Sequence, residues 1–262
     1  MNQTQSSIPA QSPGPVEPVL RKLAALASLS ESERSLVVGL AAHRQEFRAG
    51  SEIQGEGLRR TRPRLIVSGW ACRSRNLSDG RRQILMFLLP GDGIGVCSEA
   101  SPREQAGTTA ITTVNTVDAQ PVADAIAHDE CPGLKSAHAA VCALEEASLL
   151  NHIVRLGRQT AYERTAHLFL ELHWRLRLSG LTDGDRFAMP LTQEVLADAL
   201  GLSVVHVNRT LQQLRRDQLL EIRSGYVELL RPDSLASVAD FDPVTAFAVQ
   251  PLSDLGRGQR TP

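Results

Sequence analysis

One segment constrains the fold of this chain more than any other, residues 191–216, which read LTQEVLADALGLSVVHVNRTLQQLRR. Thr192 and Ser203 predict the N-caps of two successive helices, because short hydroxyl side chains accept hydrogen bonds from the free amides of a first turn. Ala197 is followed four residues later by Gly201: the small side chain lets the next helix approach, and the glycine permits a tight turn at positive φ. Two helices joined in this way form the helix-turn-helix of DNA-reading proteins. The expected core-facing positions are Val195, Leu196, Ala199 and Leu200 in the first helix, and Val207, Thr210, Leu211 and Leu214 in the second.

The outward face of the second helix is basic and polar. Residues 203–216 contain three arginines and no acid, and Asn, Gln, Arg and His side chains can hydrogen-bond base edges or phosphates. Downstream, residues 219–222 and 226–230 flank Arg223-Ser224-Gly225, which predicts a hairpin that would serve as a wing. A helical hairpin in an ordinary core with a solvated polar face is the alternative. The candidate DNA contacts are Thr192, Gln193, Ser203, Val204, Val205, His206, Asn208, Arg209, Gln212, Gln213 and Arg216.

The N-terminal half of the chain has a different character. Residues 1–17 are rich in Ser and Pro and predict a flexible tail, and leucine spacing over residues 19–43 predicts two short helices, the second with a Ser30/Glu33 capping box. From about residue 44 to residue 122, short runs of Val, Ile, Leu, Phe and Thr alternate with turn signals such as Asp79-Gly80. Strands spaced this closely predict a small antiparallel barrel or sandwich.

A long helix is expected after the strands. Residues 139–156 contain no Gly or Pro, and two apolar sets lie on adjacent faces, so the helix should bury one side against its own barrel and another against a partner helix. A single buried helix in a monomer core is the alternative. Gly157 is a candidate hinge, and residues 158–178 predict another amphipathic helix. The two apolar sets are Cys142, Leu149, Ile153 and Leu156, and Ala140, Ala147, Leu150 and Val154, the second being the expected dimer seam.

Composition excludes several classes of protein. The 262 residues carry 28 Lys and Arg against 29 Asp and Glu, which argues against indiscriminate polycationic binding to nucleic acids. Apolar runs such as Ile84–Leu89 are far shorter than the ~20 residues of a membrane span, and the polar N-terminus does not resemble a signal peptide, so we expect a cytoplasmic protein without a membrane partner. The four cysteines, Cys72, Cys97, Cys131 and Cys142, lack metal-ligand spacing, and phosphate-loop, H-E-x-x-H and G-x-S-x-G motifs are missing, so we expect neither a metal site nor an enzyme.

The order of these elements, together with three motifs, resembles the Crp/Fnr family of bacterial transcription regulators. The motifs are LSDGRRQILMFLLPGDGIG (residues 77–95), GRQTAYERTAHLFLELHWRL (residues 157–176) and residues 191–220, and FDP at 241–243 looks like the usual domain end. The resemblance implies a homodimer that binds a near-palindromic site in double-stranded promoter DNA and contacts RNA polymerase.

Residue by residue, the resemblance places Thr192 and Gln193 on phosphates and Val205, His206, Asn208 and Arg209 toward bases, with Arg209 where the family usually keeps a base-reading Arg. Val205 stands where many members keep a Glu that reads a C·G pair. A valine cannot accept that hydrogen bond and would favour a thymine methyl group, so the family's usual half-site does not carry over.

The sensor departs from the family pattern. Members that bind cyclic AMP pair a Gly-Glu with a later Arg-Ser or Arg-Thr, whereas here Gln105-Ala106 aligns with the Arg pair and Arg103 lies two residues out of register. An anionic ligand would lose its guanidinium partner. The chain has no cysteine before Cys72, which removes the N-terminal iron-sulfur site; a haem sensor stays open, and Cys97 is either a redox handle or an inert thiol. The candidate effector-pocket residues are Gly91, Asp92, Gly95, Arg103, Gln105 and Ala106.

We therefore predict an α+β protein: an N-terminal antiparallel β-roll or jelly-roll barrel, a long dimerisation helix and a C-terminal winged helix-turn-helix. The expected boundaries are a tail at 1–17, a cyclic-nucleotide-binding-like sensor at 18–135, the dimer helix and hinge at 136–157, the DNA-binding domain at 158–243 and a tail at 244–262. The expected function is a dimeric, sequence-specific transcription regulator with a divergent sensor and an unidentified small-molecule effector, without an assigned cofactor. The alternatives are a signalling module that acts through protein contacts and a true cyclic-nucleotide-responsive regulator.

Overall fold

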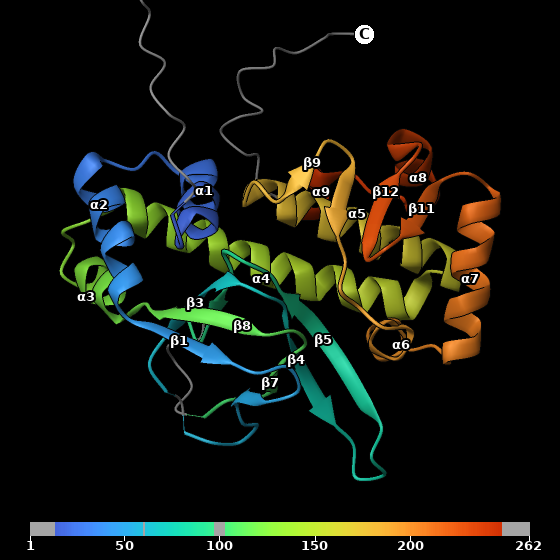
Figure 1. The fold of residues 1–262 in the computed structure, drawn as a ribbon, viewed down its shortest axis with the longest axis horizontal. Coiled ribbons are helices and arrows are strands. Elements are labelled where there is room, and N and C mark those ends of the chain that lie inside the picture. Colours follow the sequence, from blue (N-terminus) through green and yellow to red (C-terminus); the bar gives the residue numbers. More distant parts are fainter. Residues whose placement is uncertain (1–13, 60, 97–102, 248–262) are drawn as a thin grey trace, which may run out of the picture.

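The computed structural model describes residues 14–59, 61–96 and 103–247. In Figure 1 a strand-rich body lies beneath one long helix, and a helical unit with a small sheet occupies the far end. The predicted α+β fold, with its barrel, long helix and winged helix-turn-helix in that order, is confirmed. Among the described residues, none of the helices combines the length and hydropathy that crossing a lipid bilayer requires.

The barrel is built from two four-stranded antiparallel sheets, ordered β1-β8-β3-β6 and β2-β7-β4-β5. Asp79 and Gly80 lie in the turn between β4 and β5, as predicted. A core cluster with Ile66, Met86, Leu88 and Val114 lies between the sheets. The strands are β1 (Arg44–Phe47), β2 (Glu52–Gln54), β3 (Arg64–Ser68), β4 (Ala71–Asn76), β5 (Arg82–Leu88), β6 (Gly93–Ile94), β7 (Gly107–Ala110) and β8 (Val114–Asp118).

Short helices precede and follow the barrel strands. They are α1 (Glu17–Leu26), α2 (Glu31–Gly39), the 3-10 turn η1 (Leu40–Ala42) and α3 (Gln120–Ala127). The capping box at α2 is present: Ser30 Oγ accepts from the Glu33 amide at 3.3 Å, and the Glu33 carboxylate accepts from the Ser30 amide at 2.7 Å. The expected tail at 1–17 is wrong at its end, because α1 begins at Glu17 and Val16 is only 3% exposed. Residues 1–13 of that expected tail lie outside the described residues.

The long helix α4 runs from Pro132 to Arg158, so it begins four residues before the expected boundary at 136. Gly157 lies within the last turn of α4 and does not break the helix. A Cβ added at this position would have no atom within 4 Å, so packing does not require a glycine here. The next helix, α5 (Ala161–Leu178), begins later than the expected residue 158, because Thr160 and Glu163 form a capping box. The connection between α4 and α5 is therefore Gln159-Thr160, not Gly157.

The C-terminal unit contains a third four-stranded sheet and, after α5, four more helices. The sheet has the antiparallel order β11-β12-β10-β9. Its elements are β9 (Thr182–Asp183), β10 (Arg186–Ala188), β11 (Leu220–Arg223) and β12 (Tyr226–Leu229), and the helices are α6 (Gln193–Leu200), α7 (Val204–Arg216), α8 (Pro232–Ala239) and α9 (Pro243–Phe247).

The expected C-terminal tail at 244–262 is wrong at its start. Helix α9 continues the fold past Pro243, and Phe247 is fully buried, stacked on Trp174 with ring centroids 4.2 Å apart and planes 9° apart. Asn151 of α4 donates to the Ala246 carbonyl at 2.8 Å. Residue 247 thus anchors the chain between α4 and α5, while residues 248–262 lie outside the described residues.

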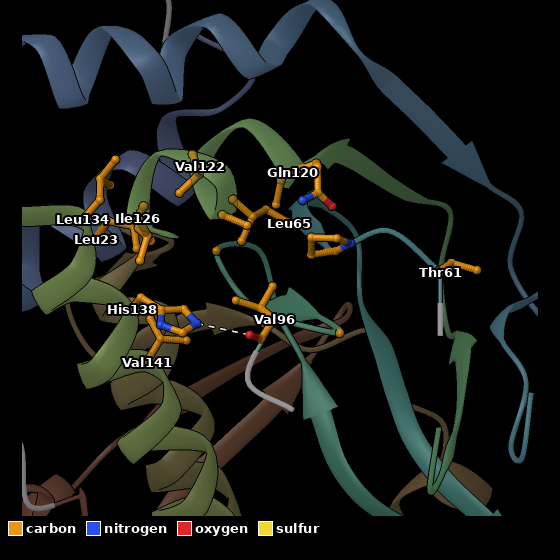
Figure 2. Close-up of a pocket in the computed structure, with 15 residues that line it drawn as sticks. Leu23, Thr61, Leu65, Val96, Gln120, Val122, Ile126, Leu134, His138 and Val141 are labelled. Carbon is orange, nitrogen blue, oxygen red and sulfur yellow. Dashed lines mark hydrogen bonds between the residues drawn. The ribbon is translucent and has the colours of Figure 1, made fainter. Parts of the chain in front are cut away.

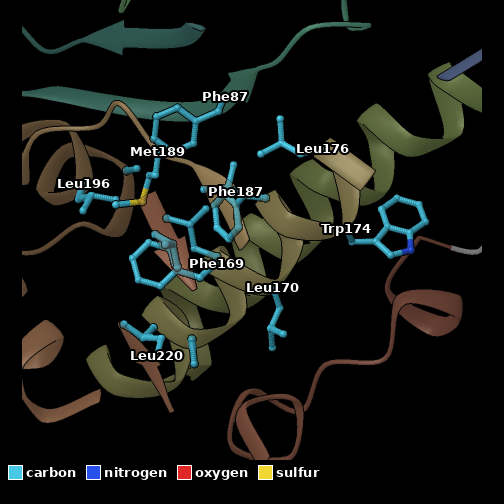
Figure 3. Close-up of a cluster of buried hydrophobic side chains, with 14 of the residues drawn as sticks. Phe87, Phe169, Leu170, Trp174, Leu176, Phe187, Met189, Leu196 and Leu220 are labelled. Carbon is cyan, nitrogen blue, oxygen red and sulfur yellow. The ribbon is translucent and has the colours of Figure 1, made fainter. Parts of the chain in front are cut away.

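The barrel and the C-terminal unit share one hydrophobic cluster. Figure 3 shows Phe87 of β5 on the same side of this cluster as Met189 and Leu196, with Phe187 and Phe169 beyond them. Polar contacts accompany the apolar ones, because Arg82 of β5 forms an ion pair with Asp198 of α6 at 2.7 Å. The two expected domains are therefore packed against each other through a common core.

Candidate nucleic-acid interface and sensor region

Helix α6 and the turn after it form as the sequence predicts. Thr192 Oγ1 accepts from the Val195 amide at 3.3 Å, and Gly201 adopts φ +63°. A Cβ built at Gly201 would meet Leu156 Cδ2 of α4 at 3.2 Å. The positive φ favours glycine here, and a larger residue would in addition press on the Leu156 side chain.

Helix α7 has one buried and one exposed face. Ser203 Oγ caps it by accepting from the His206 amide at 3.2 Å. The buried residues are Val207, Thr210, Leu211 and Leu214, which is the set predicted from the sequence. Of the predicted outward positions, His206 is half-buried and the others are exposed, with Val205 74% exposed.

The exposed face of α7 carries positive charge for which the described residues offer no acidic partner. Among the described residues, no ion pair involves Arg209, Arg215 or Arg216. One polar contact, from Gln212 Nε2 to Asn208 Oδ1 at 3.4 Å, joins neighbouring turns of this face. A row of cationic and amide side chains on the outside of a helix suits contacts with phosphates and base edges.

A hairpin lies beside α7, where the sequence predicts a wing. Strands β11 and β12 pair in register from Leu220 opposite Leu229 to Arg223 opposite Tyr226. Ser224 and Gly225 both have positive φ, +50° and +77°, as the tightest hairpin turns require. Arg186 of β10 lies over the Tyr226 ring, 4.4 Å from its centroid. In Figure 1, α7 lies at the outer edge of the molecule, and α6 and this sheet both lie on its inner side.

The buried face of helix α4 is neither of the two apolar sets picked out from the sequence: in the set expected to pack on the barrel, Ile153 is 65% exposed and Leu149 is 36% exposed. One face, from Leu134 through Val141 to His152, is buried against the rest of the chain, whereas Leu150 is 57% exposed and Val154 is 53% exposed. Of the four residues expected at a dimer seam, Ala140 and Ala147 are half-buried, so the exposed apolar stripe is concentrated at the C-terminal end of α4. Its exposed large apolar residues are Leu149, Leu150, Ile153 and Val154.

The candidate effector residues do not surround one pocket. Gly91 and Gly95 line a cavity, but the Asp92 side chain is buried and forms ion pairs with Lys22 and Arg175. Arg103 donates to the Gly57 carbonyl at 2.8 Å. The remaining two residues do not line the cavity either: Gln105 is exposed and Ala106 is buried. Asp92, Arg103, Gln105 and Ala106 therefore do not line the described cavity together with the two glycines, and their part in an effector site stays a prediction.

Asp92 instead belongs to a buried ionic chain that the sequence does not reveal. This ionic chain is a row of five side chains of alternating charge, each at most 6% exposed: Lys22, Asp92, Arg175, Glu171 and Arg155. Arg175 bridges two acids, at 2.7 Å from Asp92 and 3.2 Å from Glu171. The chain joins α1, the turn before β6, α5 and α4, so it crosses from the barrel to the C-terminal unit.

Burial alone would raise the pKa of Asp92, but the charges of Lys22 and Arg175 hold it below its ordinary value. The pKa of Glu171 is lowered against its own burial by Arg155 and Arg175. Two histidines lie beside Arg155, and Arg155 Nη1 is 3.1 Å from His167 Nδ1. Burial, followed by the charge of Arg155, lowers the pKa of His152 and the pKa of His167 to about 4. Both histidines are therefore neutral at pH 7, and His167 Nδ1 can accept from Arg155.

A cavity of about 380 Å³ lies outside the barrel, between it and the helices α1, α3 and α4 (Figure 2). His138 of α4 lines this cavity, and its Nε2 is 3.1 Å from the Val96 carbonyl oxygen. The cavity residues that come from helices are Leu23, Gln120, Val122, Ala123, Ile126, Leu134, His138 and Val141.

The cysteines offer no assembled site among the described residues. Cys72 and Cys131 are buried, and burial raises the pKa of each thiol. Cys142 Sγ is 3.7 Å from His138 Nε2. Cys97, a candidate redox handle, lies outside the described residues. Within the described part of the chain, no three His, Cys, Asp or Glu side chains gather as metal ligands would.

Comparison with known proteins agrees with this architecture. Residues 163–238 match the model of the Crp-like helix-turn-helix domain. The chain is 33% identical over 164 residues to the nitrogen fixation regulation protein FixK of Bradyrhizobium diazoefficiens, covering 62% of this chain and 68% of that protein. It is 29% identical to FixK of Azorhizobium caulinodans, covering 72% of this chain and 75% of that protein.

Solved structures give the same result. The structure of FixK2 from Bradyrhizobium japonicum superposes with a TM-score of 0.65 at 29% identity, covering 74% of this chain and 96% of that chain. The barrel, the long helix and the exposed basic helix of a winged helix-turn-helix thus define a DNA-binding transcription regulator. The chain belongs to the Crp/Fnr family. Members of this family bind promoter DNA and are typically dimeric.

Proposed function

We propose that this protein is a homodimeric regulator that reads a near-palindromic promoter site with two copies of α7. The observation that carries the proposal is the exposed face of α7, which presents Asn208, Arg209 and Gln212 without an acid among them. In a dimer of this kind, each recognition helix enters a major groove about 34 Å from its mate. RNA polymerase is the further partner that the family implies.

Within this proposal, the contacts fall into two groups. Thr192 and Gln193 begin α6 and are exposed, so they would contact phosphates and fix the register. Val205, His206, Asn208 and Arg209 occupy the first half of α7 and would reach base edges. Val205 can contact only apolar groups of a base, so we propose a thymine at the position that it faces.

The DNA-binding proposal is tested by binding to the region upstream of the protein's own gene, compared with random DNA, over a series of salt concentrations. Arg209→Ala should lose about 1–3 kcal/mol of discrimination at one base pair, the range of a bidentate contact. Arg48→Ala, an exposed arginine on the barrel, is the control and should bind as the wild type does.

Equal affinity of wild-type protein for both DNAs would contradict the proposal. Footprints that place no contact on residues 203–216 would instead favour the alternative module that acts through protein contacts.

The proposed dimer seam is the exposed apolar stripe of α4. Leu150 and Val154 lie one turn apart and are each more than half exposed, which is unfavourable for large aliphatic side chains in water. Val154→Glu should shift the protein from dimer to monomer in sedimentation experiments, because a carboxylate pair would be desolvated at the seam. Val38→Glu, on an equally exposed valine of α2, should leave the oligomeric state unchanged.

For the sensor, we propose a divergent domain that does not answer cyclic AMP. The candidate cassette supplies no guanidinium that is available for a cyclic phosphate at Gln105, and Asp92 is neutralised inside the protein. The proposed units are the sensor, the α4 dimer helix and the winged helix-turn-helix, with the sequence-based boundaries near 135 and 158 adjusted to the observed ends of α4.

A further inference from the structure

The cavity between α1, α3, α4 and the outer face of the barrel is the right size for a small organic ligand. Its volume of about 380 Å³ lies within the range of about 300–1,000 Å³ that such sites occupy. Leu23, Leu65, Leu134 and Val141 contribute well-buried side chains from three different elements. In the close-up of Figure 2, Val122 and Ile126 approach from α3 and His138 and Val141 from α4, so the walls converge on one space.

Among the described residues, the lining includes no Asp, Glu, Lys or Arg side chain. An anionic ligand such as a nucleotide needs cationic or amide donors, and the neighbouring cations Lys22 and Arg175 are already paired with Asp92. A charged ligand would therefore lose its hydration without gaining a counter-charge. The described lining therefore favours an uncharged ligand over a phosphate or a carboxylate.

The polar side chains of the lining already contact other parts of the protein. Thr61 Oγ1 donates to Gln54 Oε1 at 2.6 Å, and Gln120 Nε2 donates to Asp124 Oδ1 at 2.8 Å. His138 Nε2 faces the Val96 carbonyl. Apolar contact is therefore the main means of recognition that the cavity offers.

We infer that this cavity is a binding site for an uncharged, mostly apolar small molecule. The site is distinct from the α7 face, and it does not depend on DNA binding. Leu134, His138 and Val141 line it at positions i, i+4 and i+7 of α4, so a ligand would press against the same helix that carries Leu150 and Val154 further along. Binding would add contacts between α4, α3 and the pair Gly95 and Val96.

The test uses the full chain and the neutral apolar fluorophore N-phenyl-1-naphthylamine. Wild-type protein should bind it saturably, one per chain, and should be stabilised against heat by it. Ala123→Phe places a ring in the cavity and should weaken binding at least tenfold. Val244→Phe makes a similar change on an exposed position of α9 and should bind as the wild type does. Cyclic AMP should not displace the fluorophore.

Two further variants keep the inference falsifiable. If Ala123→Phe does not fold, Ala123→Leu fills less space and should still weaken binding. Leu77→Glu alters an exposed apolar residue of the turn between β4 and β5, away from the cavity, and should leave binding intact. Absence of saturable binding, unchanged affinity in a folded Ala123 variant, or loss of binding in Leu77→Glu alone would each overturn the inference, whatever the DNA experiments show.

Discussion

The outer face of α7 and the buried ionic chain use similar side chains for opposite purposes. On α7, Arg209 and its neighbours are exposed and lack acidic partners within the described residues, so their charge remains available to a second molecule. In the ionic chain, Arg155 and Arg175 are almost completely buried, and both are paired with Glu171. An arginine in this protein thus serves the fold when a carboxylate lies beside it, and is available to bind a second molecule when none does. The amino-acid composition does not distinguish these two cases.

The largest expected effect comes from breaking the buried ionic chain at Asp92. Asp92→Asn leaves the buried Lys22 without its carboxylate and Arg175 with Glu171 alone, so it should lower the free energy of unfolding by about 3–5 kcal/mol. Urea unfolding followed by circular dichroism measures this change. Asp79→Asn, in an exposed pair with Arg81, is the matched control and should cost less than about 1 kcal/mol. Equal effects of the two substitutions would remove the distinction between buried and exposed pairs.

The next effect concerns pH and the two histidines beside Arg155. The pKa of His152 and of His167 is lowered to about 4 in the folded protein, whereas an unfolded histidine titrates near 6.5. Between those values the unfolded chain takes up protons that the folded chain refuses, so stability falls as the pH falls. From pH 6.5 to pH 5 the two sites together should cost on the order of 3 kcal/mol.

The double variant His152→Gln, His167→Gln should flatten the unfolding free energy over that pH interval. The lowered pKa values of Asp92 and Glu171 act in the same direction, but at lower pH, because unfolded carboxyls titrate near 4. A wild-type stability that does not change between pH 6.5 and pH 5 would contradict the histidine assignment.

The smallest expected effect lies on the exposed side, at the cap of α7. Ser203→Ala removes the acceptor for the His206 amide and should cost about 1 kcal/mol of stability. Ser203→Asp keeps an acceptor and adds a favourable charge at the helix N-terminus, so it should retain wild-type stability in the same unfolding experiment. Loss of stability in Ser203→Asp equal to that of Ser203→Ala would show that the hydroxyl acts otherwise than as a cap.

Local features of the fold could be predicted from the sequence because their partners lie close along the chain. Thr192, Ser203 and Ser30 each cap a helix by accepting from the amide three residues further along the chain. The turn at Gly201 is recognisable from its spacing to Ala197, four residues earlier. The buried face of α7 follows from helical spacing alone. The same holds for the wing hairpin, whose turn residues stand between its strands.

Contacts between distant residues could not be predicted in this way. Lys22 and Asp92 are 70 positions apart, and Asp92 and Arg175 are 83 apart, so sequence alone left Asp92 as a ligand candidate. Gly157 looked like a hinge because glycine weakens helices, but packing of α4 along the whole molecule outweighs one residue's propensity. Phe247 offered a weak signal, an aromatic residue in an apolar run after Pro243, and its partner Trp174 lies more than 70 positions earlier.

The common core has a consequence for how the protein melts. Trp70, in the barrel, and Trp174, in the C-terminal unit, belong to the same cluster of buried side chains, and they are the two tryptophans of the chain. The cluster is continuous from the barrel to the C-terminal unit, so we expect its two ends to lose their packing together. Fluorescence from both rings and the helical signal should therefore change together in one cooperative transition, as in a protein whose sensor and reader form one thermodynamic unit.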